Sequence, residues 1–505
     1  MTAPLRLFNS LTREIETFTP IHPGEARVYS CGPTVYNYPH IGNMRAYVFA
    51  DVLGRALSWK GLALTHVINI TDVGHLTDDA DAGEDKLEKA AAERAQSIWD
   101  IARHYTEAYW ADIKALNIRQ PAHWSIATDY VPAMIEFAKG IADKHCYELE
   151  GGLYFDVSTV ADYGRLARAV TDEGANSLGG RIEAVEGKRN AADFAIWRKT
   201  PPGETRQMEW DSPWGRGAPG WHLECSVMSG QLLGFPFDIH TGGIDHREIH
   251  HPNEIAQNQA FCCAGPLDVP ANSGARVWMH NNFLVERSGK MSKSAGEFLR
   301  LQLLIDKGYH PLAYRMMCLQ AHYRSELEFG WDGLGAALTR LKRLVMAVET
   351  VRARHAEKGE PDLAAPVGGW TLDSAVDEVG GTLRPLIVRF DKAVSDDLST
   401  PQALTVLEEL LALKKMPPRE VLAAVGMMDT VLGLGLLSLG RAELRVRPKA
   451  ARMTEAEISA ALSRRNAARA QKDFATSDAI RDELAGRGVE LMDGDPLGWE
   501  WQLGD

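Results

Sequence analysis

The sequence predicts an α/β protein in which a parallel sheet, interrupted by an insertion, is followed by helices and a small C-terminal domain. Three observations support this class. A strand–helix–strand succession lies near the N-terminus, loops rich in glycine and proline fill about 121–219, and a helical pattern follows residue 314. Because 505 residues exceed the size at which one hydrophobic core stops growing, we expect several domains.

The first part of the chain contains a βαβ unit. Residues 26–30 form a predicted buried strand, a helix is expected from about Pro39 to Gly61, and residues 62–70 form the next strand. A helix that connects two strands of one sheet makes them parallel, with the functional site at their carboxyl ends. We therefore expect a Rossmann-like sheet.

The remaining elements follow in order. A long charged helix is expected over 85–116, and short strands such as 153–157 lie within the insertion. Strands resume at 237–240 and 277–285, and these complete the first domain. After residue 314 the chain is predicted to be almost wholly helical to about residue 439, with a surface linker over 351–369. The predicted domains are 1–310 with the insertion at 121–219, then 311–365, 366–445 and 446–505.

The composition is that of a soluble globular protein, with 45% hydrophobic and 24% charged residues. No apolar run could cross a bilayer, and residues 1–18 lack the apolar core of a secretory signal, so we expect a cytoplasmic protein without membrane contact. The net charge of −13 argues mildly against a nucleic-acid partner, unless positive charge is concentrated locally. Residues 447–487, rich in arginine, are the best candidate for such a region.

The six cysteines are widely spread and show no small-domain disulfide pattern. In a reducing compartment such cysteines are better interpreted as metal ligands or buried thiols. We interpret Cys262 and Cys263 as thiols of a helix core.

The segment from His40 to Asn43 begins the first predicted helix. Unpaired backbone N–H groups and the helix dipole favour an anion at this position, and Gly42 carries no side chain that would obstruct a nucleotide. His40 can donate to a phosphate oxygen. The alternative is a helix whose first histidine only caps or packs.

A second motif, from Lys290 to Ser294, follows Gly289 after a predicted strand. Its two lysines, Lys290 and Lys293, could neutralise charge that develops on the α-phosphate and on departing pyrophosphate. The alternative is a solvated basic loop, but the complete five-residue string makes this improbable.

A third set of residues has the chemistry of a zinc site. His250 and Glu254 are spaced i, i+4 and so share one helix face, and Cys31 and Cys225 could supply two thiolates. No short pair of cysteines supports zinc by spacing alone. Core thiols are therefore the alternative interpretation of Cys31 and Cys225.

Together these three sets resemble those of the cysteinyl-tRNA synthetase family, a member of the class I aminoacyl-tRNA synthetases. The resemblance extends along nearly the whole chain. It includes Tyr29–Tyr36, Asn69–Asp72, Asp193–Trp197, Gly220–Met228, Gly242–Asp245, Asn253–Gln257, Ala321–Ser325 and Asp396–Pro401.

The resemblance implies a role for each site residue. The ATP-binding residues would be His40, Gly42, Asn43, Gly243, Asp245 and Lys293, and the catalytic residues His40, Asn43, Lys290 and Lys293. The substrate pocket would contain Gly32, Thr71, Trp221 and His240, although a core indole is the alternative for Trp221. One zinc per chain, held by Cys31, Cys225, His250 and Glu254, would take the substrate sulfur as a ligand.

The resemblance also implies the activity of a cysteine–tRNA ligase. ATP, accompanied by Mg²⁺, would react with L-cysteine to give cysteinyl adenylate, and the 3′ end of tRNA(Cys) would then take the cysteinyl group. Residues 1–310 would form the catalytic domain with a connective insertion at 121–219, 311–365 a stem-contact or linker region, 366–445 an anticodon-binding bundle and 446–505 a small tRNA-recognition domain. We expect a monomer.

Two alternatives differ in function. A mycothiol-pathway ligase, which joins cysteine to an amino sugar, would share the zinc site and the adenylate chemistry but lacks the long helical tail. A tRNA-binding paralogue with an inactive site would not need an intact lysine loop or a complete set of zinc ligands.

Overall fold

The computed structural model describes residues 3–73, 97–167, 186–286, 289–290, 299–359, 369–379, 381–492, 495 and 497–503. The first part of the predicted helix over 85–116 and residues 360–368 of the predicted linker lie outside these ranges. In the part that is described, no helix is long and apolar enough to cross a membrane.

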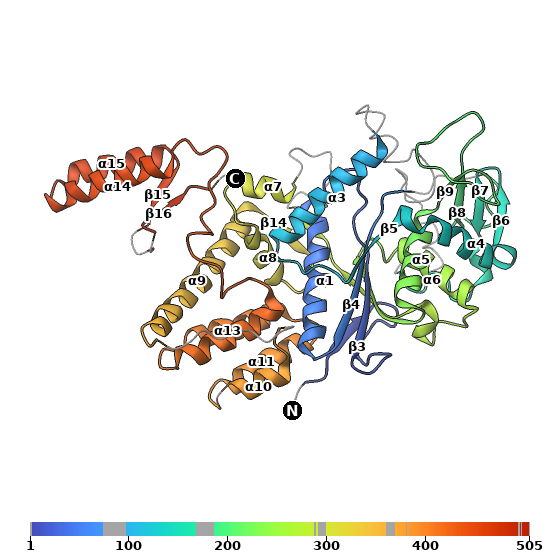
Figure 1. Ribbon diagram of the computed structural model, residues 1–505, viewed down its shortest axis with the longest axis horizontal. Coiled ribbons are helices and arrows are strands. Elements are labelled where there is room, and N and C mark those ends of the chain that lie inside the picture. The colour runs from blue at the N-terminus through green and yellow to red at the C-terminus, as the bar shows by residue number, and fades with distance from the viewer. Residues whose placement is uncertain are drawn as a thin grey trace.

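A parallel sheet of five strands forms the centre of the first domain, which confirms the predicted fold class (Figure 1). Its strand order is β11-β10-β3-β4-β5, and every neighbouring pair is parallel. The strands are β3 (Glu25–Ser30), β4 (Ala63–Ile70), β5 (His123–Ile126), β10 (Phe237–Gly243) and β11 (Ala275–Asn281).

Helix α1 (Ile41–Trp59) connects β3 to β4 and begins and ends near the predicted positions. His40 is its N-cap, and Gly61, with φ of +80°, ends the connection in a conformation that glycine adopts readily. Most of its side chains are buried, because α1 packs on the sheet at one side and on α13 (Pro418–Leu432) at the other. The helix therefore lies between the two main parts of the molecule.

The insertion contains its own antiparallel sheet with the strand order β6-β7-β8-β9. It begins later than predicted, because residues 123–126 form β5 at the edge of the main sheet. The helices that precede this sheet in the chain are α3 (Ile98–Ala115) and α4 (Val131–His145), and those that follow it are α5 (Trp221–Leu233) and α6 (His250–Cys262). The strands of the insertion are β6 (Cys146–Leu149), β7 (Gly152–Phe155), β8 (Phe194–Lys199) and β9 (Gly217–Pro219).

The predicted strand at 277–285 is two strands in two sheets. After β11 the chain turns at Asn282 and enters β12 (Leu284–Glu286), which pairs with β13 (Gly289–Lys290) and with β14 (Leu327–Phe329). At the N-terminus, β1 (Arg6–Asn9) and β2 (Glu14–Thr17) form a hairpin.

The second half of the chain is mostly helical, as predicted. Helix α9 continues to Ala356, through the start of the predicted linker, and packs on α8, α12 and α13. The predicted regions 311–365 and 366–445 therefore share one helical unit. Its helices are α7 (Leu301–Asp306), α8 (Pro311–Leu319), α9 (Trp331–Ala356), α10 (Leu372–Glu378), α11 (Arg384–Ser395), α12 (Thr400–Leu411) and α13.

The C-terminal domain has a separate hydrophobic core, in which Trp499 and Trp501 are buried. It contains a helical hairpin, α14 (Glu455–Ala470) and α15 (Phe474–Gly486), and a two-stranded sheet, β15 (Val489–Leu491) and β16 (Trp499–Trp501). The hairpin projects at the end of the molecule opposite the insertion (Figure 1). One larger core extends through the main sheet and the helical unit.

Candidate active site

A cavity of about 400 Å³ lies at the carboxyl ends of the parallel strands. This is where ligands bind in open α/β sheets. Its wall combines residues that follow β3, the start of α1, the end of β10 and the β11–β12 turn. The sequence-predicted residues that line it are Cys31, Gly32, His40, Gly42, Asn43, Trp221, Gly243, Asp245 and His250.

The His40–Asn43 motif combines both interpretations that the sequence left open. The His40 Nδ1 atom accepts from the backbone N–H of Asn43 at 3.3 Å, and the Asn43 side chain accepts from the His40 backbone N–H at 3.3 Å. This capping box fixes the first turn of α1, and it places the proton of a neutral His40 ring on Nε2. Since both residues line the cavity, capping the helix does not exclude contact with a ligand.

At two positions of the cavity wall, neighbouring atoms approach the backbone so closely that glycine is required. A Cβ atom at Gly42 would lie 2.8 Å from the His40 ring, and one at Gly32 would lie 1.7 Å from the backbone oxygen of Asn69. The Gly32 N–H donates to Asn69 Oδ1 at 2.7 Å. Because no side chain fits at either position, the wall at these points is backbone.

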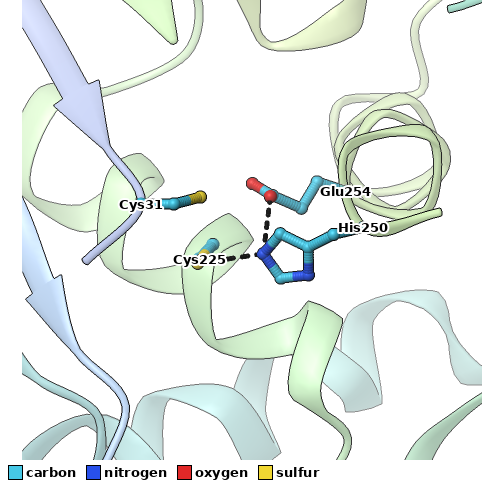
Figure 2. Close-up of side chains that lie close together, drawn as sticks. All are labelled: Cys31, Cys225, His250 and Glu254. Atoms are coloured by element: carbon cyan, nitrogen blue, oxygen red, sulfur yellow. Dashed lines mark hydrogen bonds and ion pairs between the residues drawn. The ribbon is translucent and has the colours of Figure 1, made fainter. Parts of the chain in front are cut away.

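The four predicted zinc ligands come together from three segments (Figure 2). Cys31 follows β3, Cys225 lies in α5, and His250 and Glu254 lie one turn apart in α6. One ligand atom from each lies within 4.8 Å of the others, and all four residues are buried. His250 Nε2 lies 3.0 Å from Glu254 Oε1 and 3.4 Å from Cys225 Sγ. Two thiols, an imidazole and a carboxylate fit the coordination preferences of zinc.

The charge state of this cluster favours a cation. Burial raises the pKa of Cys225, but a hydrogen bond with Cys31 and the charge of His250 outweigh burial and lower that pKa to about 6. Burial also raises the pKa of Glu254, yet His240 and His250 lower it to about 2. Burial and the Cys225 hydrogen bond raise the pKa of Cys31. Burial lowers the pKa of His250, but Glu254 and Cys225 outweigh burial and raise it to about 10. Without a metal, the cluster thus combines a thiolate and a carboxylate with a protonated imidazole, and a metal ion would displace the protons of His250 and Cys31.

In a second group, Cys31, His240, His251 and Glu254, one ligand atom from each residue also lies within 4.8 Å of the others. His240 and His251 are fully buried, and His251 is already hydrogen bonded to His280, at 2.7 Å. Only the first group has both thiols and a histidine that lines the cavity. It is therefore the better site for a metal that meets a substrate.

The predicted pocket residues occupy two different layers. Trp221 is half-buried, lines the cavity and stacks on His250 with ring centroids 4.3 Å apart, so it is not a core indole. Thr71 and His240 lie behind the wall and are not among the cavity-lining residues. Thr71 donates to Glu224 at 3.0 Å, and His240 Nε2 lies 2.8 Å from Glu254 Oε2.

The sequence interpretation missed several buried polar residues behind the site. They are Glu224, whose pKa burial and the neighbouring Cys225 raise well above its usual value, and the histidines His222, His251 and His280. The interpretation also missed His246, which is half-buried and lines the cavity itself. One signal was available, because His246-Arg247-Glu248-Ile249-His250-His251 is unusually rich in histidine.

The lysine motif is only partly within the described residues. Lys290 ends the short strand β13, which pairs with β12 just beyond the cavity wall, but its side chain is not described. Lys293 lies outside the described residues altogether.

One interpretation of the cysteines is wrong. Cys262 and Cys263 are exposed at the end of α6 and are not core thiols. Cys263 has φ of +48°, so the chain leaves the helix there and turns away from the packed face.

Comparison with known proteins identifies the family of the chain. Residues 17–338 match the family model "tRNA synthetases class I (C) catalytic domain", and residues 453–496 match "Cysteinyl-tRNA ligase anticodon binding domain". Among solved structures, a leucyl-tRNA synthetase (LeuRS) of Agrobacterium radiobacter covers 83% of this chain and 84% of its own, at TM-score 0.53 and 12% identity. A methionyl-tRNA synthetase of Mycobacterium tuberculosis covers 84% and 92%, at TM-score 0.51 and 14% identity. These structural likenesses show the fold.

Sequence relatives are much closer. The cysteine–tRNA ligase of Novosphingobium aromaticivorans is 74% identical over 99% of this chain and 98% of its own. That of Zymomonas mobilis is 55% identical with the same two coverages. With the catalytic and anticodon-binding models both matched in order, the chain belongs to the cysteine–tRNA ligase family of class I aminoacyl-tRNA synthetases.

Proposed function

We propose that this protein attaches cysteine to tRNA(Cys) in two steps at the cavity beside Cys31 and His250. In the first step the carboxylate of L-cysteine attacks the α-phosphate of ATP, which gives cysteinyl adenylate and pyrophosphate. In the second step the terminal ribose hydroxyl of the tRNA attacks the adenylate carbonyl and AMP leaves. The observation that carries the proposal is the buried set of four zinc-type ligands that adjoins the nucleotide-sized cavity.

The metal cluster supports a preference for cysteine. A thiol and a hydroxyl differ little in size, so packing alone would separate cysteine from serine only modestly. Zinc held by Cys31, Cys225, His250 and Glu254 would take the substrate sulfur as a soft ligand, which a serine hydroxyl matches poorly. The Trp221 ring, stacked on His250, would orient that imidazole and form one wall of the amino-acid pocket.

Thr71 and His240 support the pocket from behind its wall. Thr71 Oγ1 accepts from the Asn69 side-chain N–H, and Oδ1 of the same Asn69 side chain accepts from the Gly32 N–H, so Thr71 orients the backbone of the wall through Asn69. His240 holds one oxygen of Glu254 and leaves the other directed to His250. We assign both residues to positioning the first layer and not to contact with cysteine.

The nucleotide would occupy the opposite part of the cavity. His40, Gly42 and Asn43 present the N-terminus of α1 to phosphate, and Gly243 and Asp245, at the end of β10, would face the adenosine. Lys290 and Lys293 would neutralise the charge that develops on the phosphates, together with Mg²⁺. Since no group of the protein need form a covalent intermediate, positioning and electrostatic stabilisation carry the catalysis.

The C-terminal domain would bind the anticodon end of tRNA. Phe474 at the tip of its helical hairpin is 61% exposed, an unusual position for an aromatic ring, and Lys472 and Arg469 lie exposed beside it in sequence. Exposed aromatic rings stack on unpaired bases, and neighbouring cations bind phosphates. The amino-sugar ligase is not favoured, because relatives that are cysteine–tRNA ligases match the whole length, this domain included.

Three measurements on purified protein test the proposal. ATP–pyrophosphate exchange should depend on cysteine, with serine failing to support it at equal concentration, and a pool of tRNA should be charged only on tRNA(Cys). Metal analysis should find about one zinc per chain. Exchange without any charging of tRNA, or charging of an amino sugar, would refute the tRNA step, whereas exchange by rigorously zinc-free protein would refute the proposed recognition of the thiol. We retain a cytoplasmic, monomeric enzyme as part of this proposal.

A further inference from the structure

Asp397 is a buried carboxylate in an unusual backbone conformation far along the chain from the cavity. It connects α11 to α12, and both Asp397 and Leu398 have left-handed backbones, with φ of +52° and +57°. Residues other than glycine rarely adopt this conformation, and consecutive examples are held in place by surrounding contacts. Here the Asp397 N–H donates to the backbone oxygen of Arg6 at 2.9 Å.

The Asp397 carboxylate is the meeting point of three segments. Oδ1 accepts from the Phe8 N–H at 2.8 Å and from the Tyr323 hydroxyl at 2.6 Å. Oδ2 accepts from Arg324 Nε at 2.6 Å. The helical unit thus holds both the N-terminal strand β1 and the turn 321–325 through one side chain, and only a carboxylate offers acceptors for all of these donors.

The turn 321–325, which Asp397 contacts, is hydrogen bonded to the wall of the cavity. The backbone oxygen of Tyr323 accepts from the Asn282 N–H at 2.8 Å, and that of Arg324 accepts from the Asn282 side chain at 3.0 Å. Just beyond, β14 pairs with β12 along its whole length. Asn282 and Phe283 line the cavity. Tyr323 and Arg324 therefore connect Asp397 directly to this wall.

Arg45 connects the cavity wall and the turn 321–325 to α1, the helix that begins with the His40–Asn43 motif. It is 2% exposed, lies in α1 two residues after Asn43, and its guanidinium donates to the backbone oxygens of Asn282 and Phe283. The second terminal nitrogen of the guanidinium, Nη2, donates to the backbone oxygens of His322 and Ser325 in the turn. The N-terminus of α1 and the β11–β12 wall are therefore held at a fixed separation.

We propose that Asp397 is a positioning residue for the ATP part of the active site, acting through Tyr323 and Arg324 on the cavity wall at Asn282 and Phe283. This inference rests on the proposed ATP site, and it adds to that site a residue of the helical unit that touches no substrate. Misplacing a binding wall by about 1 Å costs up to roughly a hundredfold in rate. Loss of the Oδ2 acceptor releases Arg324 and frees the turn to shift relative to α1.

The test is Asp397→Asn, which keeps the volume and one acceptor but turns an N–H₂ group toward Arg324. Asp396→Asn is the matched control, because Asp396 is the neighbouring residue and its side chain is 57% exposed in a surface pair with Arg6. Each variant is assayed by cysteine-dependent ATP–pyrophosphate exchange, with active sites counted from the amount of adenylate formed in a single turnover.

Asp397→Asn should raise the KM for ATP about tenfold per active site and leave the KM for cysteine within about twofold, since the metal cluster lies on other elements. Asp396→Asn should change neither constant. A merely structural role predicts a lower count of active sites with unchanged constants, and that result would overturn the proposal. If Asp397→Asn does not fold, Tyr323→Phe, which removes only one hydroxyl, must still raise the KM for ATP, and an unchanged KM there overturns the proposal equally.

His40→Ala separates this inference from the proposed function. If His40→Ala leaves ATP binding unaltered, the assignment of the nucleotide site is wrong. If His40→Ala weakens ATP binding and Asp397→Asn does not, the site stands and the positioning role of Asp397 is wrong.

Discussion

Replacing Asp51 should destabilise the joint between the sheet domain and the helical unit. This carboxylate on α1 is 1% exposed and faces three arginines, at 2.7 Å (Arg55), 2.6 Å (Arg315) and 3.8 Å (Arg119). Arg315 also donates to the backbone oxygen of Leu432 at the end of α13. Asp51→Asn keeps the shape of the side chain but removes the charge that compensates these cations.

The loss in the free energy of unfolding on Asp51→Asn can be worked out in two ways. Burial raises the pKa of Asp51, but Arg315 and Arg55 outweigh it and hold that pKa at about 2, against 3.8 for an unperturbed carboxyl. The difference corresponds to about 2 kcal/mol of stability from the ionised carboxylate. Removing one partner of a buried ion pair costs about 3–5 kcal/mol, because the remaining charge is uncompensated. We expect Asp51→Asn to lower the free energy of unfolding by about 2–5 kcal/mol.

The assay is urea denaturation followed by tryptophan fluorescence, between pH 8 and pH 5. The folded pKa of Asp51 lies below the unfolded value, so its contribution is complete above about pH 4 and is lost as the pH falls from there toward 2. The difference in the free energy of unfolding between the unmodified protein and Asp51→Asn should therefore be constant from pH 8 to pH 5. Asp100→Asn is the control, since Asp100 is 61% exposed in a surface pair with Arg103 and should cost no more than about 0.5 kcal/mol. Equal losses in the two variants, or a deficit that shrinks above pH 5, would refute this reasoning.

Three further predictions concern the active site and the tRNA. Cys225→Ser should lose zinc on dialysis and lose cysteine activation with it, whereas Cys262→Ser should keep both; metal analysis and exchange assays on the same samples check this, and an active zinc-free variant would contradict it. Lys293→Ala should slow adenylate formation by about two to three orders of magnitude with little change in cysteine affinity, measured by rapid quench, because one transition-state contact is lost. Lost cysteine binding at an unchanged maximal rate would instead make Lys293 a pocket residue. Truncation near Arg447 should leave exchange largely intact and severely reduce aminoacylation, and full charging by the truncated chain would exclude the tail as the recognition domain.

The parts of the fold set by local pattern were predictable from the sequence. The βαβ unit is an example, because residues 26–30 and 62–70 are largely apolar, and Pro39 and Gly61 mark the approximate start and end of the helix between them. The insertion boundary was less accurate, since β5 joins the main sheet only through pairing with β4, and a single edge strand carries no local sign of its sheet.

The site was predictable where residue identity decided it. The i, i+4 spacing of His250 and Glu254 is a local signal, but Cys31 and Cys225 are distant in sequence and joined the set through the family resemblance. The position of His240 behind the wall depends on the register between β10 and β3. In this register His240 lies opposite Tyr29, and the pairing places His240 beside Glu254. No periodicity in the sequence specifies such a contact between elements.

The strongly negative chain and its nucleic-acid partner are reconciled by how charge is distributed, but only partly. Residues 447–487 contain nine basic and six acidic side chains, an excess of three in a protein with net charge −13. Within them, Arg465 is buried, and Arg464 and Arg487 pair with acidic residues of the same domain. So small an excess neutralises few phosphates, and we expect this domain to add little to the dependence of tRNA affinity on salt. We therefore expect recognition by this domain to depend on contacts to bases, for which the exposed ring of Phe474 is well placed.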